Sequence, residues 1–361
     1  MKPVNLLDYA IRASERLDAA ALAHFDGGAA DEHTLRENAR AWADIPLWPR
    51  VLRPLAHGHA GTHLLGRTMT FPMLLAPVAH QRLAHADAEL GSALAAASQG
   101  AGFVLSTQSS VSLETVAAAV RDDPERGPLW FQLYWPHDGG FLRELLGRVE
   151  NAGFEAIVLT ADAPTSGARD RERRAGFQVP AGLQVNLAGL GPRPARPMSA
   201  RQSPLFDDLL CDAPTWDDLT TLRGLTTLPI LLKGVLRSDD ARQAIAAGAA
   251  GLVVSNHGGR TLDTAVATAR ALPRIVDAVA GAVPVLVDGG IRRGTDVLKA
   301  LALGADAVLV GRPQVHALTV AGAQGVAHMI RLLRDELEIA MALCGCATLA
   351  DIEPSLLDGA G

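Results

Sequence analysis

A unit that occurs twice at a constant spacing is the feature that most constrains the fold of this chain. The segments DDARQAIAAGAAGLVVSN (239–256) and TDVLKALALGADAVLVGR (295–312) each predict a helix, then a glycine, then a β-strand, and NAGFEAIVLTAD (151–162) repeats the same junction. At that junction Gly248 and Gly304 can end the helix in the left-handed conformation that other residues resist. A chain that alternates helices and strands in this way forms a parallel sheet.

Short apolar, β-branched runs between the helical stretches predict eight strands. They are FPMLLAPVA (71–79), FVLS (103–106), LWFQLYW (129–135), AIVLTAD (156–162), PILLKGV (229–235), GLVVSNH (251–257), VPVLVDGG (283–290) and AVLVGRP (307–313). Eight parallel strands joined by helices most economically close into a TIM barrel, whose active site lies at the carboxyl ends of the strands. An open doubly wound sheet is the alternative, but no strand is followed by the GxGxxG turn that its dinucleotide-binding form requires.

Two segments lie outside this repeat. Residues 5–42 are predicted to form helices packed beside or beneath the barrel, within an N-terminal helical segment that we place at 1–70. Residues 171–215 form a long irregular excursion after the fourth strand, and excursions of this length are usually lids or disordered. Because barrels of this type routinely reach this size as one unit, we predict a single domain over 1–361.

The composition argues against several classes of partner. Hydrophobic residues make up 48% of the chain and charged residues 20%, which supplies a large core and argues against disorder. A net charge of −6 argues against nucleic acid and anionic lipid, both of which need a basic face. Asp8 and Arg12 interrupt the apolar run that a signal peptide would need, and no later run is long enough to span a membrane. We therefore expect a cytoplasmic protein.

Polar residues gather where the predicted strands end, and in a parallel barrel these ends meet on one face. They are Ser106, Gln132, Tyr134, Thr160, Asp162, Lys233, Ser255, His257, Asp288 and Arg312, with Arg169, Arg260 and Arg292 on the following loops. Hydrogen-bonding groups combined with several cations suit a polar heterocycle that carries a phosphate, together with an anionic substrate.

Each of these features has a structural alternative when it is taken alone. The glycines of DGGIRRG (288–294) and GRP (311–313) offer close backbone approach to a phosphate, but they could equally serve tight turns. Lys233 ends a buried strand and needs an anion nearby, which an ordinary carboxylate could supply. His257 could be a satisfied core histidine, but Arg260, three residues later, favours a base beside a carboxylate-binding group.

From about residue 5 to residue 355 the chain resembles the L-2-hydroxy acid oxidases and dehydrogenases that depend on flavin mononucleotide (FMN). This family includes glycolate oxidase, lactate oxidase, mandelate dehydrogenase and hydroxymandelate oxidase. The most specific stretch is LLKGVLRSDDARQAIAAGAAGLVVSNHGGRTLD, followed by VLVDGGIRRGTDVLKALALGADAVLVGRP. The resemblance implies FMN as the cofactor, a small 2-hydroxy acid as the substrate, and dioxygen or another electron acceptor.

The resemblance also implies a role for each matching residue. His257 matches the catalytic base, Asp162 the carboxylate that supports it, and Lys233 can neutralise charge on the reduced flavin. The carboxylate and hydroxyl of the substrate are held in the family by groups that match Arg169, Arg260 and Tyr134, and we count Tyr134 among the catalytic residues as well. Flavin and phosphate contacts are matched by Pro77, Ala79, Ser106, Gln132, Thr160, Lys233, Ser255, Asp288, Gly290, Arg292, Gly311 and Arg312.

The chain departs from the family pattern inside the expected pocket. A tyrosine near the N-terminus usually helps to bind the substrate carboxylate, in a pattern like YYASGAxDxxTL, whereas HFDGGAADEHTLREN places His24 there. Either His24 substitutes as a donor, or the arginines and Tyr134 suffice, or the substrate differs from the common short acids. Gln108 stands where glycolate-type members often carry tryptophan, which makes the wall polar or smaller. Ala79 resembles the oxidases, since family dehydrogenases more often have glycine there.

No metal site is expected. The histidines of HGHAGTH (57–63) lack a carboxylate or cysteine partner in a fixed frame, so this segment is predicted to be a solvated loop. Cys211, Cys344 and Cys346 cannot form a disulfide framework, and CGC indicates buried structural thiols. RERR (171–174) indicates a solvated face of the excursion.

The sequence therefore predicts oxidation of an L-2-hydroxy acid to the 2-oxo acid, with electrons passing from FMN to dioxygen and giving hydrogen peroxide. Alternatives are the same half-reaction with a quinone or other acceptor, another type of FMN barrel, and a catalytically silent FMN-binding relative. The substrate is left open between a short aliphatic and a mandelate-like acid, and overall similarity to hydroxymandelate oxidases favours the latter. Because the family is commonly tetrameric or octameric, we expect a homo-oligomer.

Overall fold

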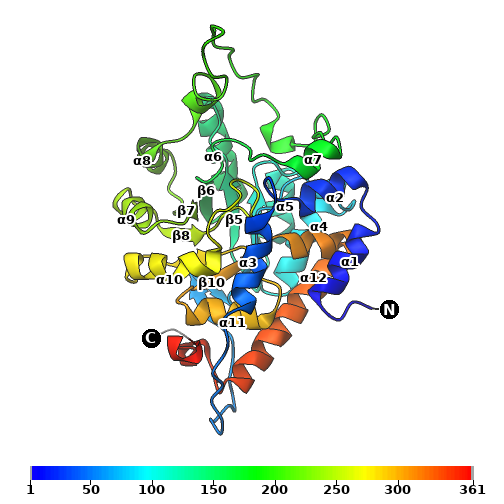
Figure 1. Cartoon of the computed structure of the whole chain (residues 1–361), viewed down its shortest axis with the longest axis vertical. Helices are drawn as coiled ribbons and strands as arrows, with labels where there is room; N and C mark the ends of the chain where they lie inside the picture. Colours follow the sequence, from blue (N-terminus) through cyan, green and yellow to red (C-terminus); the bar gives the residue numbers. More distant parts are fainter. Residues whose placement is uncertain (1, 359–361) are drawn as a thin grey trace.

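A closed ring of parallel strands forms the centre of the computed structural model, which describes residues 2–358 (Figure 1). The strands are β3 (Met73–Leu75), β4 (Gly102–Ser106), β5 (Leu129–Leu133), β6 (Ala156–Thr160), β7 (Ile230–Val235), β8 (Gly251–Val254), β9 (Val285–Val287) and β10 (Ala307–Val310). Each strand pairs with the next in the chain, and β10 closes the ring on β3. The eight predicted strands and the TIM barrel are confirmed, and the open doubly wound sheet is wrong.

The strands are buried on both faces, which is why they appear in the sequence as continuous apolar runs. Alternate side chains from every strand, such as Val104, Trp130 and Leu231, form one inner cluster that fills the barrel. The residues between them, such as Phe103 and Phe131, join the larger cluster under the helices. This division follows from the two-residue period of a β-strand.

Helices follow most of the strands and cover the outside of the barrel (Figure 1). They are α4 (Ala88–Ser98), α5 (Leu113–Val120), α6 (Gly139–Ala152), α8 (Trp216–Leu225), α9 (Ser238–Ala246), α10 (Thr268–Val279), α11 (Gly294–Ala302) and α12 (Arg312–Leu343). The predicted junction glycines Gly248 and Gly304 have φ of +88° and +94°, so they end α9 and α11 in the left-handed conformation as expected. The helix α12 is interrupted by non-helical backbone at Ala321 and Gly322.

The N-terminal segment is helical only in its first part. The helices α1 (Leu6–Ser14), α2 (Ala19–Asp26) and α3 (His33–Ala43) confirm the prediction for residues 5–42. The prediction of a helical segment to residue 70 is wrong, because residues 44–61 are irregular and β1 (Thr62–Leu64) and β2 (Arg67–Met69) form a hairpin. Prolines in the irregular part, at 46, 49 and 54, each remove a backbone donor that a helix needs.

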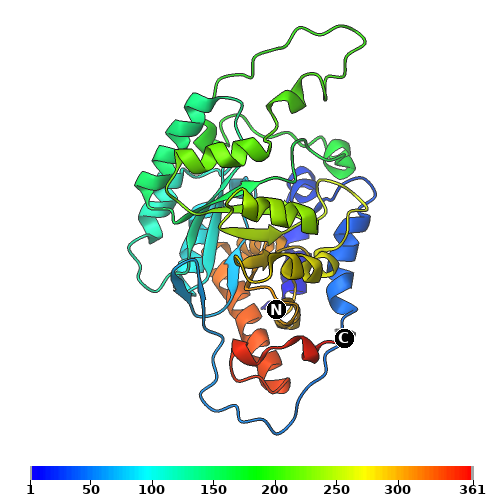
Figure 2. The ribbon, with the colours of Figure 1, turned by 90° about the vertical axis from the view of Figure 1, so that its left-hand side faces the viewer.

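The two ends of the barrel are covered by different segments, as Figure 2 shows. Residues 44–61 lie at one end with the C-terminal segment, which contains η4 (Leu349–Asp351) and η5 (Pro354–Leu356), and bridges join Leu47 to Leu357 and His59 to Thr348. The excursion after β6 extends from the opposite end. None of the helices within residues 2–358 is long and apolar enough to cross a membrane.

The excursion is irregular, as predicted, apart from α7 (Asp170–Arg174), η2 (Val185–Leu187) and η3 (Leu209–Asp212). The buried Asn186 joins it to the barrel, because its side chain accepts the Leu113 N–H at 2.9 Å and donates to Ser109 Oγ at 2.7 Å. Farther along, Arg193 forms ion pairs with Asp208 and Asp212 at 2.8 and 2.6 Å. Whether the excursion acts as a lid stays a prediction.

Candidate active site

A cavity of about 160 Å³ opens at the carboxyl ends of the barrel strands. All of the residues predicted for the site line this cavity except Asp162 and Ser255. Asp162 and Ser255 lie directly behind its wall, where they bond to His257 and Lys233. The barrel topology thus brings together side chains that follow different strands along the chain.

His257 stands on a sharp turn just after β8. Its φ of +56° is unusual for a residue with a side chain, and the left-handed Gly258 and Gly259 continue the turn. Its Nδ1 lies 3.1 Å from Asp162 Oδ1, and its Nε2 lies 3.3 Å from Tyr134 Oη. Because a carboxylate only accepts hydrogen bonds, the proton resides on Nδ1, and the lone pair of Nε2 on the neutral ring faces the Tyr134 hydroxyl at the cavity wall.

The electrostatic surroundings keep this imidazole neutral and its partner ionised. Burial lowers the pKa of His257, and the nearby Lys233 ammonium lowers it further, against the opposing effect of Asp162. Burial alone would raise the pKa of Asp162, but the charges of Lys233 and His257 outweigh burial and lower it. A neutral base backed by a carboxylate is the arrangement that general base catalysis requires.

A glycine on the neighbouring strand makes room for Asp162. Gly234 has a φ of +109°, and a Cβ built on it would lie 2.4 Å from Asp162 Cβ. Any larger residue would therefore clash with Asp162 and would also be strained. Asp162 Oδ2 is buried without a hydrogen-bond partner among the described residues, so this carboxylate retains an unused acceptor.

Lys233, near the carboxyl end of β7, is almost completely buried. Its Nζ donates to Ser255 Oγ at 2.9 Å and lies 3.5 Å from Asp288 Oδ2. Burial would lower the pKa of Lys233, but Asp288 and Asp162 outweigh it and raise the pKa, so the ammonium is charged. The sequence predicted that Lys233 needs an anion nearby, and the carboxylate of Asp288 supplies one. Lys233 also lines the cavity.

The cavity wall fits the ring and polyol of FMN. Polar side chains from neighbouring strands form a row in which Ser106 Oγ bonds to Gln132 Oε1 at 3.1 Å and Gln132 Nε2 to Thr160 Oγ1 at 2.9 Å. Asp288 Oδ1 is buried and has no partner among the described residues, and such an acceptor suits a hydroxyl of a bound polyol. The donors and acceptors that a flavin needs are therefore in place, with Lys233 beside them.

Arg292 and Arg312 form a buried cationic corner that fits a phosphate. Arg312 donates to the carbonyl oxygens of Phe25, Gly27 and Gly258 at 2.9 to 3.1 Å, and burial together with Arg260 and Arg292 lowers its pKa to about 9. Within residues 2–358, neither guanidinium forms an ion pair with a carboxylate. Buried positive charges without a paired negative charge are costly, so a bound dianion would stabilise this corner.

Backbone at the same corner is held close to the N-terminal helices. Gly290 has a φ of +86°, and a Cβ there would lie 2.2 Å from the carbonyl oxygen of Asn38 in α3. The turn after β9 can therefore pack against α3 only if this residue is glycine. This close packing places α3 directly against the turn that forms the phosphate corner.

Arg169 and Arg260 form a second cationic pair in the cavity wall. Glu172 lies between them, with its Oε1 3.3 Å from Arg169 Nη1 and 3.0 Å from Arg260 Nη2. Arg169 Nε is buried and has no partner among the described residues. Arg169 therefore retains a buried donor for the carboxylate of a substrate.

Glu172 was missed as a site residue from the sequence. RERR was predicted to be a solvated face, and this holds for Arg171, Arg173 and Arg174, which are exposed. It is wrong for Glu172, whose side chain is only 15% exposed. The spacing could have indicated it, because residues three apart on a helical turn share a face and Glu172 follows Arg169 by three.

The residues that differ from the family pattern, or that distinguish its oxidases, lie in the expected pocket. His24 and Gln108 line the cavity, and so does Ala79 after β3. His80, which the sequence reasoning did not single out, lines it as well and lies beside His24, with ring nitrogens 3.3 Å apart. Only its position next to Ala79 could have suggested it.

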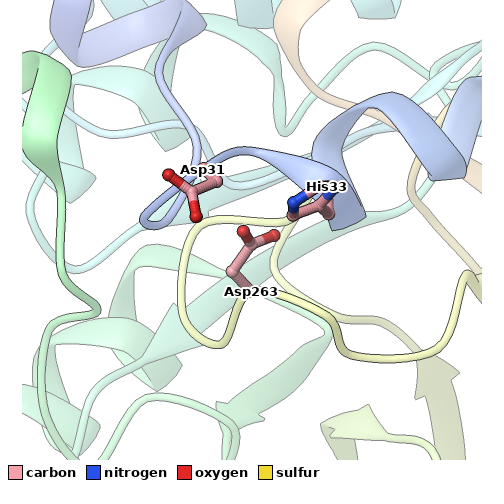
Figure 3. Close-up of side chains that lie close together, drawn as sticks. All are labelled: Asp31, His33 and Asp263. Carbon is pink, nitrogen blue, oxygen red and sulfur yellow. The ribbon is translucent and has the colours of Figure 1, made fainter.

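Other clusters of polar residues lie outside this cavity. Asp31, His33 and Asp263 place ligand atoms within 4.8 Å of one another at the surface (Figure 3). Asp263 has a structural role there, because its Oδ1 accepts the Thr34 N–H at 2.9 Å at the start of α3. Cys344 and Cys346 are buried as predicted, and His57, His59 and His63 are exposed on their loop.

Comparisons with known proteins agree with this geometry. Residues 13–359 match the family model described as FMN-dependent dehydrogenase. The chain is 48% identical to an L-lactate oxidase of Roseobacter sp. (strain GAI101), over 99% of this chain and 95% of the relative. It is 45% identical to a peroxisomal (S)-2-hydroxy-acid oxidase of Oryza sativa subsp. japonica, over 98% and 95%. A crystal structure of mandelate oxidase with (S)-2-phenylpropionate superimposes with a TM-score of 0.87 at 42% identity, covering 99% of this chain and 98% of that one. The chain therefore belongs to the FMN-dependent 2-hydroxy acid oxidase family.

Proposed function

We propose that this enzyme oxidises an L-2-hydroxy monocarboxylic acid to the 2-oxo acid and passes the electrons to dioxygen, giving hydrogen peroxide. The observation that supports it most is one cavity in which His257 Nε2 and Tyr134 Oη lie near the pair Arg169 and Arg260. A base and a carboxylate clamp on one wall select an acid whose hydroxyl-bearing carbon lies next to its carboxylate. Similarity to L-lactate oxidases and to mandelate oxidase supports the same reaction class.

In the proposed reaction the protein residues divide the work. Arg169 and Arg260 hold the substrate carboxylate, and Tyr134 Oη orients the hydroxyl toward His257. His257 takes a proton at Nε2, and Asp162 stabilises the imidazolium through its bond to Nδ1. The neutral state of His257 in the free site makes this transfer possible at neutral pH.

FMN, when bound, would supply the acceptor for two electrons. We assign its ring to the row from Ser106 to Thr160, with Lys233 placing a positive charge where negative charge develops. Its polyol is assigned to Asp288 and its phosphate to Arg292, Arg312, Gly290 and Gly311. Pro77 and Ala79 would contribute the backbone wall after β3, and Ser255 positions Lys233 through its hydrogen bond.

A second cavity leaves room for more than one substrate size. It has a volume of about 270 Å³ and shares Gln108, Tyr134 and Thr160 with the first. Apolar side chains of the barrel mouth and excursion, among them Trp135 and Leu187, line it. Both short acids and acids with an aryl group therefore belong in the test panel.

The decisive experiment records the visible spectrum of the FMN-loaded protein without air. L-lactate, glycolate, (S)-mandelate and their D or R counterparts are added in turn. We expect an L-acid to bleach the flavin band and readmitted air to restore it with stoichiometric hydrogen peroxide. Slow restoration by air and fast restoration by a quinone would assign the dehydrogenase alternative. A yellow protein that no acid bleaches would support the silent binder, and a protein that cannot retain FMN would refute the assignment.

We further propose a single domain in a homo-oligomer of four or eight copies in the cytoplasm. Exposed apolar side chains on the N-terminal region, such as Val4, Leu7 and Ile11, support association between copies. Light scattering coupled to size-exclusion chromatography tests this. A species at the monomer mass of 37.8 kDa at micromolar concentration would contradict the oligomer.

A further inference from the structure

Four polar side chains from separate parts of the chain form a continuous line that ends at the arginine pair. Gln184 Nε2 lies 3.0 Å from His80 Nε2, His80 Nδ1 lies 3.3 Å from His24 Nε2, and His24 Nδ1 lies 3.2 Å from Glu172 Oε1. Gln184 belongs to the excursion and His24 to α2. The ring of His24 also stacks on Phe177, with centroids 4.3 Å apart.

The chemistry of the last group sets the direction of every hydrogen bond in this line. The Glu172 carboxylate can only accept, so His24 donates from Nδ1 and its Nε2 accepts. His80 then donates from Nδ1, which leaves its own Nε2 to accept from the Gln184 amide. Both ring nitrogens of His24 are therefore occupied within the protein, and neither remains as a donor for a substrate carboxylate.

Glu172 occupies a position between two guanidinium groups, where an anion is attracted. Its Oε1 contacts Arg169, Arg260 and His24 at 3.0 to 3.3 Å. Although burial opposes ionisation, His24 and the two guanidiniums lower the pKa of Glu172 to about 2, so it is ionised throughout the working pH range. The arginine pair thus holds a carboxylate of the protein itself before any substrate arrives.

We propose that Glu172 is a resident carboxylate that competes with the substrate for Arg169 and Arg260, and that His24 is a positioning residue that keeps Glu172 there. The inference rests on the proposed function, because it assumes that the arginine pair receives the substrate carboxylate. Two carboxylates that share two guanidiniums repel each other strongly in a partly buried site. Substrate binding must overcome this repulsion. Glu172, held by His24, therefore sets the affinity for the substrate as well as its orientation.

The test measures binding of a ligand that cannot be oxidised. The probe 2-hydroxy-2-methylpropanoate carries the carboxylate and hydroxyl but no hydrogen on its α-carbon, and its amide serves as the uncharged control ligand. Isothermal titration calorimetry of the FMN-loaded protein gives both dissociation constants. We expect Glu172→Gln to bind the acid at least tenfold more tightly and the amide with little change.

A matched control variant lies two residues away. Asp170→Asn removes the same charge from the same helix, but the Asp170 side chain is 38% exposed, against 15% for Glu172, and it pairs with the exposed Arg173 and Arg174. It should leave both dissociation constants unchanged. Unchanged or weaker binding of the acid by Glu172→Gln, in a protein of unaltered melting temperature, would refute the competition and make Glu172 a support for the arginines.

A double-mutant cycle tests the role of His24. His24→Phe keeps a ring on Phe177 but removes the hydrogen bond to Glu172, so we expect tighter binding of the acid by a smaller factor than in Glu172→Gln. In the Glu172→Gln background the same substitution should have no effect, because His24 acts through Glu172. Equal effects in both backgrounds would refute the positioning role.

Failure of this inference can be distinguished from failure of the proposed function. If an L-acid bleaches the wild-type flavin but Glu172→Gln binds the probe no more tightly, the reaction stands and the competition is wrong. If no acid bleaches the flavin and wild type does not bind the probe, the proposed function itself fails.

Discussion

The support that Asp162 gives to His257 can be measured with an isosteric substitution. Asp162→Asn keeps the shape that fits against Gly234 and removes the negative charge 3.1 Å from Nδ1 of the base. During turnover the base becomes an imidazolium, and the ion pair with Asp162 stabilises that charge. The variant therefore affects the proton transfer far more than it affects packing.

The magnitude follows from the geometry. Two unit charges about 4 Å apart attract by about 4 kcal/mol at an effective dielectric constant of about 20. The His257 and Asp162 side chains are 18% and 10% exposed, so solvent screens part of this. Because about 1.4 kcal/mol corresponds to a factor of ten in rate, we expect flavin reduction to slow by about a hundredfold or more.

Anaerobic stopped-flow absorbance gives the rate of flavin reduction directly, separate from reoxidation. The pH profile supplies an independent readout, since only the neutral imidazole can act as base. Asp162 raises the pKa of His257, so its neutralisation should move the acidic limb of the profile to lower pH. A reduction rate within threefold of wild type, in a protein with normal FMN content, would falsify the role of Asp162.

Three further predictions concern the cofactor corner, the barrel wall and the pH dependence of stability. Arg312→Met should weaken FMN binding at least tenfold in a fluorescence titration of the apoprotein, because it removes a donor from the phosphate corner. The control Arg293→Met removes a half-exposed arginine paired with Glu336 and should leave FMN binding unchanged. Equal effects of the two substitutions would contradict the phosphate assignment. Gly234→Ala should lower the free energy of unfolding by about 2 kcal/mol or more, because its Cβ would strike Asp162. The control Gly224→Ala in α8 adds a Cβ that meets nothing within 4 Å, so it should be neutral or stabilising. Similar urea midpoints for the two variants would refute the clash. Burial lowers the pKa of His80 from 6.5 to about 4, so between these pH values the unfolded chain binds a proton that the folded site rejects. The contribution of neutral His80 to stability is therefore complete above pH 6.5 and is lost as the pH falls toward 4. His80→Gln should reduce the loss of unfolding free energy between pH 7 and pH 4 by at most about 3 kcal/mol, and urea unfolding curves that respond to pH identically in both proteins would contradict the assignment.

Local patterns in the sequence were sufficient for the barrel and most of its wall. The two-residue period and apolar character of the strands, together with junction glycines such as Gly248 and Gly304, depend on residues close in the chain, so they can be recognised without the fold. The N-terminal boundary at residue 70 was wrong, although the prolines at 46, 49 and 54 already mark a stretch where a helix cannot continue. It is the contacts with Leu357 and Thr348 that hold this stretch in place.

Much of the site could also be predicted from the sequence, because the carboxyl ends of parallel strands meet on one face and the motifs around Lys233 and His257 are specific. The sequence by itself therefore determined the fold class, the family and the set of residues around the cavity. Only the tertiary structure decided how these residues pair: Gly234 against Asp162, His257 Nε2 facing Tyr134 Oη, and Glu172 between two arginines. Residues 24, 80, 172 and 184 are far apart along the chain, and hydrogen-bond direction and burial become defined only when folding brings them together.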